Sequence, residues 1–138
     1  MRLLLLIVSL ASLTACSSTD IRRDPATDLN QFKRFYVETR INDNHATDAV
    51  IAAELRSLGF EATHGHLTMI PDDIDVLITY DARWTWDFRS YLINLEITAQ
   101  HPRTLKLIAT GNAHHPGITK KEPAKMVRAI FKKFFKQT

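Results

Sequence analysis

Apolar and polar residues alternate along the middle of the chain. Every second residue is apolar within 76–88, and the same period recurs in 91–99 and 105–110. A period of two gives each strand one buried face and one wet face. Short connections join the three segments, which therefore predict an antiparallel meander. The apolar faces comprise Val76, Ile78, Tyr80, Ala82, Trp84, Trp86 and Phe88, then Tyr91, Ile93, Leu95, Ile97 and Ala99, then Leu105, Leu107 and Ala109.

Residues 46–58 have the spacing of an amphipathic helix. The polar run Asn42-Asp43-Asn44 before it offers N-cap chemistry, and Gly59 follows at the position where helices commonly end. Phe60 can make the hydrophobic contact that often accompanies such an end. The core-facing stripe of this helix is Ile51, Leu55 and Leu58.

A second helix is predicted near the end of the chain. Thr119 and Glu122 have capping-box spacing, and Pro123 suits the first turn of a helix. Its apolar stripe is Met126, Val127, Ile130, Phe131 and Phe134. Residues 32–38 and 60–64 add two strands. The order strand, helix, strand, three-strand meander, helix predicts an α+β two-layer sandwich, with a mostly antiparallel sheet and its helices on one face.

The first fifteen residues have the layout of a secretory signal peptide. Met1-Arg2 is positive, and residues 3–13 are uncharged and too short to span a membrane as a helix. The four residues Leu13-Thr14-Ala15-Cys16 resemble the lipobox of bacterial lipoproteins. The resemblance implies cleavage before Cys16 and acylation of Cys16. Because Ser17 rather than aspartate follows, it also implies the periplasmic face of the outer membrane.

Composition divides the rest of the chain into a tether and one domain. Cys16 is the only cysteine, so it forms no intramolecular disulfide. Residues 16–27 predict a lipidated cysteine and a polar tether, with a reach of at most roughly 35–40 Å. Residues 28–138 suit a single α+β domain. After removal of residues 1–15, 17 Lys and Arg face 15 Asp and Glu, a net charge of +2 that gives no reason to expect nucleic acid as a partner.

Three segments together resemble a family of small bacterial lipoproteins, the domain of unknown function 4136 (DUF4136). They are the run 32–37, the helix end Leu58-Gly59-Phe60, and the strand Asp75-Val76-Leu77-Ile78-Thr79-Tyr80. Gly111 matches a later glycine of the family, and the likeness covers roughly residues 24 to 136. The resemblance implies a lipoprotein of this fold. It brings no catalytic residues with it.

Histidines provide one candidate for chemistry. His64 and His66 would share a face of a strand, and His114 or His115 could add a third imidazole to bind zinc or copper. The alternative is that these histidines lie in solvated loops, since Gly65, Pro116 and Gly117 mark turns.

Three further surfaces have both a functional and a structural interpretation. Trp84, Trp86 and Phe88 could form an aromatic patch that binds sugar rings, or could pack in the core. The basic helix 120–136 could lie on anionic lipid, or could dock on the sheet. The acids Asp72, Asp73, Asp75, Asp81 and Asp87 could pair for glycoside hydrolysis.

The sequence therefore predicts a non-enzymatic accessory or binding module of the cell envelope, held on its membrane by lipid. Its expected partners are the membrane and a nearby envelope protein or peptidoglycan. The lipid on Cys16 is the only expected cofactor. A metal-binding periplasmic protein is the alternative, and an envelope hydrolase is the third possibility.

Overall fold

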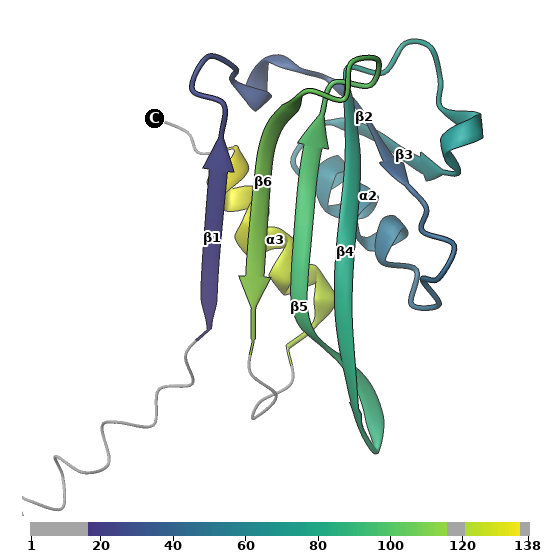
Figure 1. Cartoon of the computed structure of the whole chain (residues 1–138), viewed down its shortest axis with the longest axis vertical. Coiled ribbons are helices and arrows are strands. Elements are labelled where there is room, and N and C mark those ends of the chain that lie inside the picture. The colour runs from purple at the N-terminus through teal and green to yellow at the C-terminus, as the bar shows by residue number, and fades with distance from the viewer. Residues whose placement is uncertain (1–16, 116–120, 136–138) are drawn as a thin grey trace, which may run out of the picture.

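A computed structural model describes residues 17–115 and 121–135 as a six-stranded mixed sheet with two helices on one face (Figure 1). The strands lie in the order β1-β6-β5-β4-β2-β3. This confirms the predicted α+β class with helices packed on the sheet. The elements are β1 (Ser18–Arg23), β2 (Arg34–Glu38), α2 (Thr47–Ser57), β3 (Glu61–Gly65), β4 (Val76–Asp87), β5 (Arg89–Gln100), β6 (Leu107–His114) and α3 (Pro123–Phe134), with short 3-10 turns at Leu29–Gln31 and Leu67–Met69.

The predicted meander forms the centre of the sheet. β4 pairs with β5 and β5 pairs with β6, both antiparallel. β2 instead lies parallel to both β3 and β4, because a helix and longer connections return the chain to the same end of the sheet.

β1 is an edge strand that the sequence did not indicate. We expected residues 16–27 to form a tether, but Ser18–Arg23 pairs antiparallel with β6 along its whole length. The tether prediction is wrong for these residues. Their composition is polar because only one face of β1 is covered, and only Ile21 packs against the core.

A β-bulge in β5 changes which residues are buried. Arg83 pairs with Asn94, but Trp84 pairs with Leu92, so Ile93 is an extra residue in β5. The alternation shifts by one position there. As a result Leu92 is fully buried, whereas Ile93 is only half-buried.

A second irregularity lies at the start of β6. Ala99 pairs with Ala109, but Gln100 pairs with Leu107, so Ile108 is the extra residue. Ile108 is buried and Leu107 is exposed, as is Leu105 in the preceding turn. The predicted core positions Leu105 and Leu107 are therefore wrong, because strict alternation holds only in an unbroken strand.

Helix α2 begins and ends close to the predicted residues. Gly59 follows it with φ of 93°, a backbone conformation that residues with a Cβ rarely adopt. The N–H of Phe60 bonds to the carbonyl of Leu55, and its ring lies 4.9 Å from that of Phe35. The predicted helix end and its hydrophobic contact are confirmed.

Helix α3 packs against β6 at a glycine. The predicted apolar stripe of α3 is buried throughout, and Pro123 is its first residue, as expected. Glu122 precedes the helix as its N-cap without a side-chain bond, and Thr119 lies outside the described residues. A Cβ on Gly111 would lie 2.7 Å from Ile130 Cγ2 and 2.9 Å from Phe134 Cε1. Close approach of α3 to the sheet therefore depends on a glycine at this position.

Gly111→Ala is expected to lower the free energy of unfolding by about 1–3 kcal/mol, because the added methyl group overfills this contact. Asn112→Ala, next to it on the uncovered face, is the control and should change stability little. Urea denaturation of the two variants measures the difference. Equal stability of the variants would show that α3 can move away from the sheet at no cost.

Candidate functional site

A polar cluster lies where α2 begins beside β4. The carboxylate of Asp43 accepts hydrogen bonds from the N–H of His45 and of Thr47, both at 2.8 Å. It also accepts a bond from the hydroxyl of Tyr80 at 2.6 Å. The predicted N-cap in the Asn42-Asp43-Asn44 run is wrong, because the N-cap of α2 is Ala46, which has no side-chain bond. Asp43 still serves the start of the helix through its bond to the N–H of Thr47. A hollow of about 330 Å³ adjoins this cluster.

A second carboxylate links α2 to the two strands beneath it. Asp48 accepts a hydrogen bond from the hydroxyl of Thr39 at 2.6 Å and lies 2.8 Å from Nδ1 of His64. Asp48 is buried, whereas the His64 side chain is 40% exposed. The sequence pattern did not single out Thr39, Asp48 or the Tyr80 hydroxyl, because each lies within or directly after an element that the apolar pattern alone defines.

Burial and hydrogen bonding act in opposite directions on the two carboxylates. For both, burial is the largest single effect and raises the pKa. Bonds from Tyr80 and two backbone N–H groups outweigh it at Asp43, and bonds from Thr39, a backbone N–H and His64 outweigh it at Asp48. Both pKa values are therefore lowered. Burial and the Asp43 carboxylate raise the pKa of the Tyr80 hydroxyl, which stays protonated.

The cluster has the contacts of a structural network. Nucleophilic catalysis requires a hydroxyl in contact with a base that a third group orients. Here Asp48 lies between Thr39 and His64, and it receives a hydrogen bond from the hydroxyl. The contacts join α2 to β2 and β3, so their main effect is on stability.

The lowered pKa values predict how stability depends on pH. A carboxylate whose pKa is lowered on folding contributes stability above its unfolded pKa and loses it as the pH falls through the folded pKa. The free energy of unfolding should therefore stay nearly constant between about pH 5 and 7. It should fall below the ordinary aspartate value of 3.8. Urea denaturation across this range tests this, and Asp48→Asn should show a shallower fall than the unchanged chain.

The structure does not bring the four candidate metal ligands together. His64 lies on β3 and His114 on β6, with β2, β4 and β5 between them. Four spacings between neighbouring strands separate β3 from β6, which amounts to about 19 Å across the sheet. His115 Nδ1 lies 2.6 Å from the hydroxyl of Ser17, and His66 lies beyond the end of β3. Within residues 17–115 and 121–135 no group of three or more His, Cys, Asp or Glu side chains could hold a metal ion. The predicted shared histidine site is thus wrong.

The aromatic row on β4 divides into two parts. Trp84 is half-buried, packs against the core and stacks on His45 with ring centroids 3.7 Å apart. Trp86 is 71% exposed and Phe88 is 92% exposed. The core interpretation is therefore correct for Trp84 and wrong for the last two residues, which lie beyond the helices at the end of a long hairpin.

Phe88 has a backbone conformation that is unfavourable for its side chain. Its φ is 59°, in the left-handed region, which costs a residue with a Cβ about 1–2 kcal/mol. The ring is exposed and its one aromatic neighbour, Trp86, is exposed as well, so packing offsets little of that cost. Glycine or asparagine would suit this turn better, so folding alone does not explain a phenylalanine here.

The structure also bears on the two remaining interpretations, a basic helix that lies on lipid and a pair of catalytic acids. The apolar stripe of α3 faces the sheet and is fully buried, so the helix docks on the core and cannot lie on lipid with that face.

The candidate acids do not form one close pair along β4. Asp81 is six residues along the chain from Asp75, about 20 Å in an extended strand. Paired glycosidase acids are at most roughly 9.5 Å apart. Asp75 accepts bonds from two backbone N–H groups at the start of β2, Asp72 and Asp73 are exposed beside it, and the side chain of Asp87 is outside the described part.

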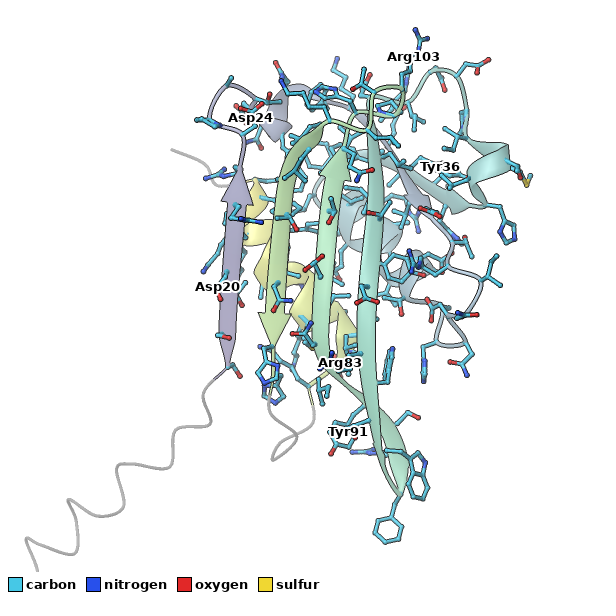
Figure 2. The ribbon with its side chains drawn as sticks, in the orientation of Figure 1. Asp20, Asp24, Tyr36, Arg83, Tyr91 and Arg103 are labelled. Atoms are coloured by element: carbon cyan, nitrogen blue, oxygen red, sulfur yellow. The ribbon has the colours of Figure 1, made fainter. Side chains whose placement is uncertain are left out.

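The uncovered face of the sheet is polar. Asp20 and Arg22 of β1, Glu96 of β5, and Thr110 and Asn112 of β6 line a shallow hollow on it. Figure 2 shows Asp20 on the edge strand and Arg83 on the long hairpin. This face therefore offers hydrogen-bonding groups rather than an apolar surface. In the described part of the chain no helix is long and apolar enough to cross a membrane.

Both edge strands have a backbone carbonyl bonded to a basic side chain. Arg56 donates to the carbonyl of Ala62 on β3 at 2.9 Å, and Lys133 donates to the carbonyl of Thr19 on β1. Such contacts limit pairing with the strands of another chain.

The fold and these sites define a two-layer α+β domain with a hydrogen-bonded polar cluster at the start of α2 and an exposed aromatic hairpin tip. Comparison with models of protein families and with curated proteins gives no match. Two solved structures of the PelC dodecamer from Paraburkholderia phytofirmans, one of them a point variant, are similar in fold, with TM-scores of 0.57 and 0.58. Each aligns with 86% of this chain and 94% of the PelC chain, at 11% and 12% identity. At that identity the similarity shows the fold alone.

Proposed function

We propose that this protein is a lipid-anchored accessory module of the cell envelope, held through Cys16 on the periplasmic face of the outer membrane. The observation that carries the proposal is the lipobox sequence ending at Cys16, the only cysteine. The next residue, Ser17, already contacts His115. A lipid on Cys16 would thus hold the domain close to the membrane. Two or more acyl chains on one residue give stable anchoring, whereas a single chain binds only reversibly.

The domain itself is proposed to bind rather than to catalyse. The carboxylates of Asp43 and Asp48 are occupied by hydrogen bonds from the protein, and Asp75 and Asp81 are too far apart to act as a pair in hydrolysis. The candidate binding surfaces are the polar open face and the hairpin tip. We further propose kinship with the DUF4136 lipoproteins. The matching segments support it through structural roles, such as Gly59 at the end of α2.

The partner is proposed to be an envelope protein or peptidoglycan. Among protein partners, a second copy of this chain is the first to test. The similar fold of PelC, which its structures describe as a dodecamer, favours this order of tests. Crosslinking in intact cells distinguishes the cases by the mass of the adduct. No protein or peptidoglycan adduct above background would contradict the binding role.

Fatty-acid labelling of cells tests the anchor. The unchanged chain should incorporate a clickable fatty acid and sediment with membranes. Cys16→Ser should incorporate none, because serine has no thiol to receive the diacylglycerol. Equal labelling of the variant and the unchanged chain would contradict the proposed function.

A further inference from the structure

The first described residues, Ser17 and Ser18, and the aromatic hairpin lie at the same end of the sheet. Ser18 pairs with His114, His114 with Asn94, and Asn94 with Arg83. The start of β1 is thus level with Arg83, and the chain of β4 continues from there to the turn at Phe88. Figure 1 shows β4 and β5 projecting beyond the ends of β1 and β6 at this end.

The lengths of the two segments determine which reaches farther. Five residues separate Arg83 from Phe88, about 16 Å in an extended strand. Two residues separate Ser18 from Cys16, at most about 7 Å. When the sheet stands upright on a membrane, the tip therefore extends about 9 Å deeper than the anchored cysteine can reach. That depth matches the roughly 5–10 Å to which interfacial apolar groups enter a bilayer.

The chemistry of the tip suits the boundary between headgroups and acyl chains. Trp86 and Phe88 are its exposed aromatic side chains, with ring centroids 6.1 Å apart. Tryptophan is favoured at this depth because its ring is apolar and its N–H can bond to water or headgroups. At the base of the hairpin, a hollow of about 390 Å³ is lined by Arg89, Tyr91 and Lys121 among others. Figure 2 shows Tyr91 on the same projecting hairpin.

We infer that the β4–β5 hairpin tip inserts Trp86 and Phe88 into the leaflet that holds the lipid on Cys16. This inference rests on the proposed function, because the anchor brings the tip to the membrane. By sequence, Arg83, Arg89 and Lys121 face Asp87 and Glu122 at this end, an excess of one positive charge. Insertion is driven mainly by the two aromatic side chains, so anionic lipid should strengthen it but is not required.

The two tryptophans of the chain allow a matched test. Full-length protein purified from membranes is reconstituted into phosphatidylethanolamine and phosphatidylglycerol vesicles, with and without lipids brominated on the acyl chains. Trp84→Phe leaves Trp86 as the only tryptophan, and Trp86→Phe leaves the half-buried Trp84. The Trp86 ring lies 6.1 Å from that of Phe88, so its emission should fall about twofold or more with brominated lipid, and Trp84 emission should change little.

A second pair of variants separates insertion from folding. Phe88 and Leu105 both have positive φ and exposed apolar side chains, at opposite ends of the sheet. Phe88→Gly should reduce the quenching of Trp86, and Leu105→Gly should leave it unchanged, although both remove strain from a turn. Equal quenching in the two variants would overturn the inference.

Flotation of the same vesicles distinguishes failure of the inference from failure of the proposed function. Protein that floats while Trp86 stays unquenched and accessible to iodide would overturn insertion and leave the anchor standing. The tip would then face a partner in water. Protein that does not float would overturn both. Quenching that occurs only with phosphatidylglycerol present would contradict the aromatic mechanism.

Discussion

Phe134→Ala is expected to lower the free energy of unfolding by about 3–5 kcal/mol, the usual cost of truncating a buried phenylalanine. Phe134 is fully buried near the end of α3, where it contacts Phe131 and Phe135 and faces Gly111. The same region holds β1 in place, because Arg23 donates to the carbonyl of Phe134. The truncation therefore weakens the helix, the sheet and the edge strand together.

Lys132→Ala is the control for this prediction. Lys132 lies on the exposed side of the same helix, so its truncation should change stability by less than about 0.5 kcal/mol. Urea denaturation at neutral pH measures both. A loss below about 1 kcal/mol for Phe134→Ala would contradict a docked helix and restore the interpretation in which α3 lies on lipid.

Asp43→Ala is expected to cost about 2–3 kcal/mol, because it removes the acceptor for a backbone N–H at the start of α2 and for a buried hydroxyl. Its carboxylate serves the N–H groups of His45 and Thr47 and the hydroxyl of Tyr80, which is 4% exposed. Without it all three donors lose their partner while the core still excludes water from the tyrosine.

Two variants bound the contribution of Asp43. Asn44→Ala changes the exposed neighbour and should have little effect. Asp43→Asn keeps one acceptor oxygen and should lie between the two. Thermal and urea unfolding should find Asn44→Ala the most stable of the three variants, Asp43→Asn intermediate and Asp43→Ala the least stable. An Asp43→Ala protein as stable as Asn44→Ala would show that the cluster contributes nothing to the fold.

The periodic segments were predictable because their burial follows directly from strand and helix geometry. The meander, α2 and α3 each have one apolar face, and tertiary packing covers most of it. The predicted stripe residue Leu58 is an exception, since it is exposed at the end of α2. The two bulges were not predictable, since an extra residue such as Ile93 or Ile108 is apolar like its neighbours. Only the cross-strand register shows which of them faces the core.

The sequence did not indicate β1, and it left two interpretations of the hairpin tip open. β1 lies at an edge and has a single core residue, Ile21, so its sequence resembles a linker. Trp86 and Phe88 continue the apolar alternation of β4, and the sequence does not say where the covering helices stop. Because β1 begins at Ser18, only Ser17 of the expected tether precedes the sheet in the described part of the chain.

The mass of the N-terminal tryptic peptide tests the central claim most directly. Protein extracted from membranes should yield the peptide from Cys16 to Arg22, beginning at Cys16 and carrying a diacylglycerol on sulfur and an acyl chain on the amine. A peptide with a free thiol at Cys16, or a mature chain that begins elsewhere, would contradict the account.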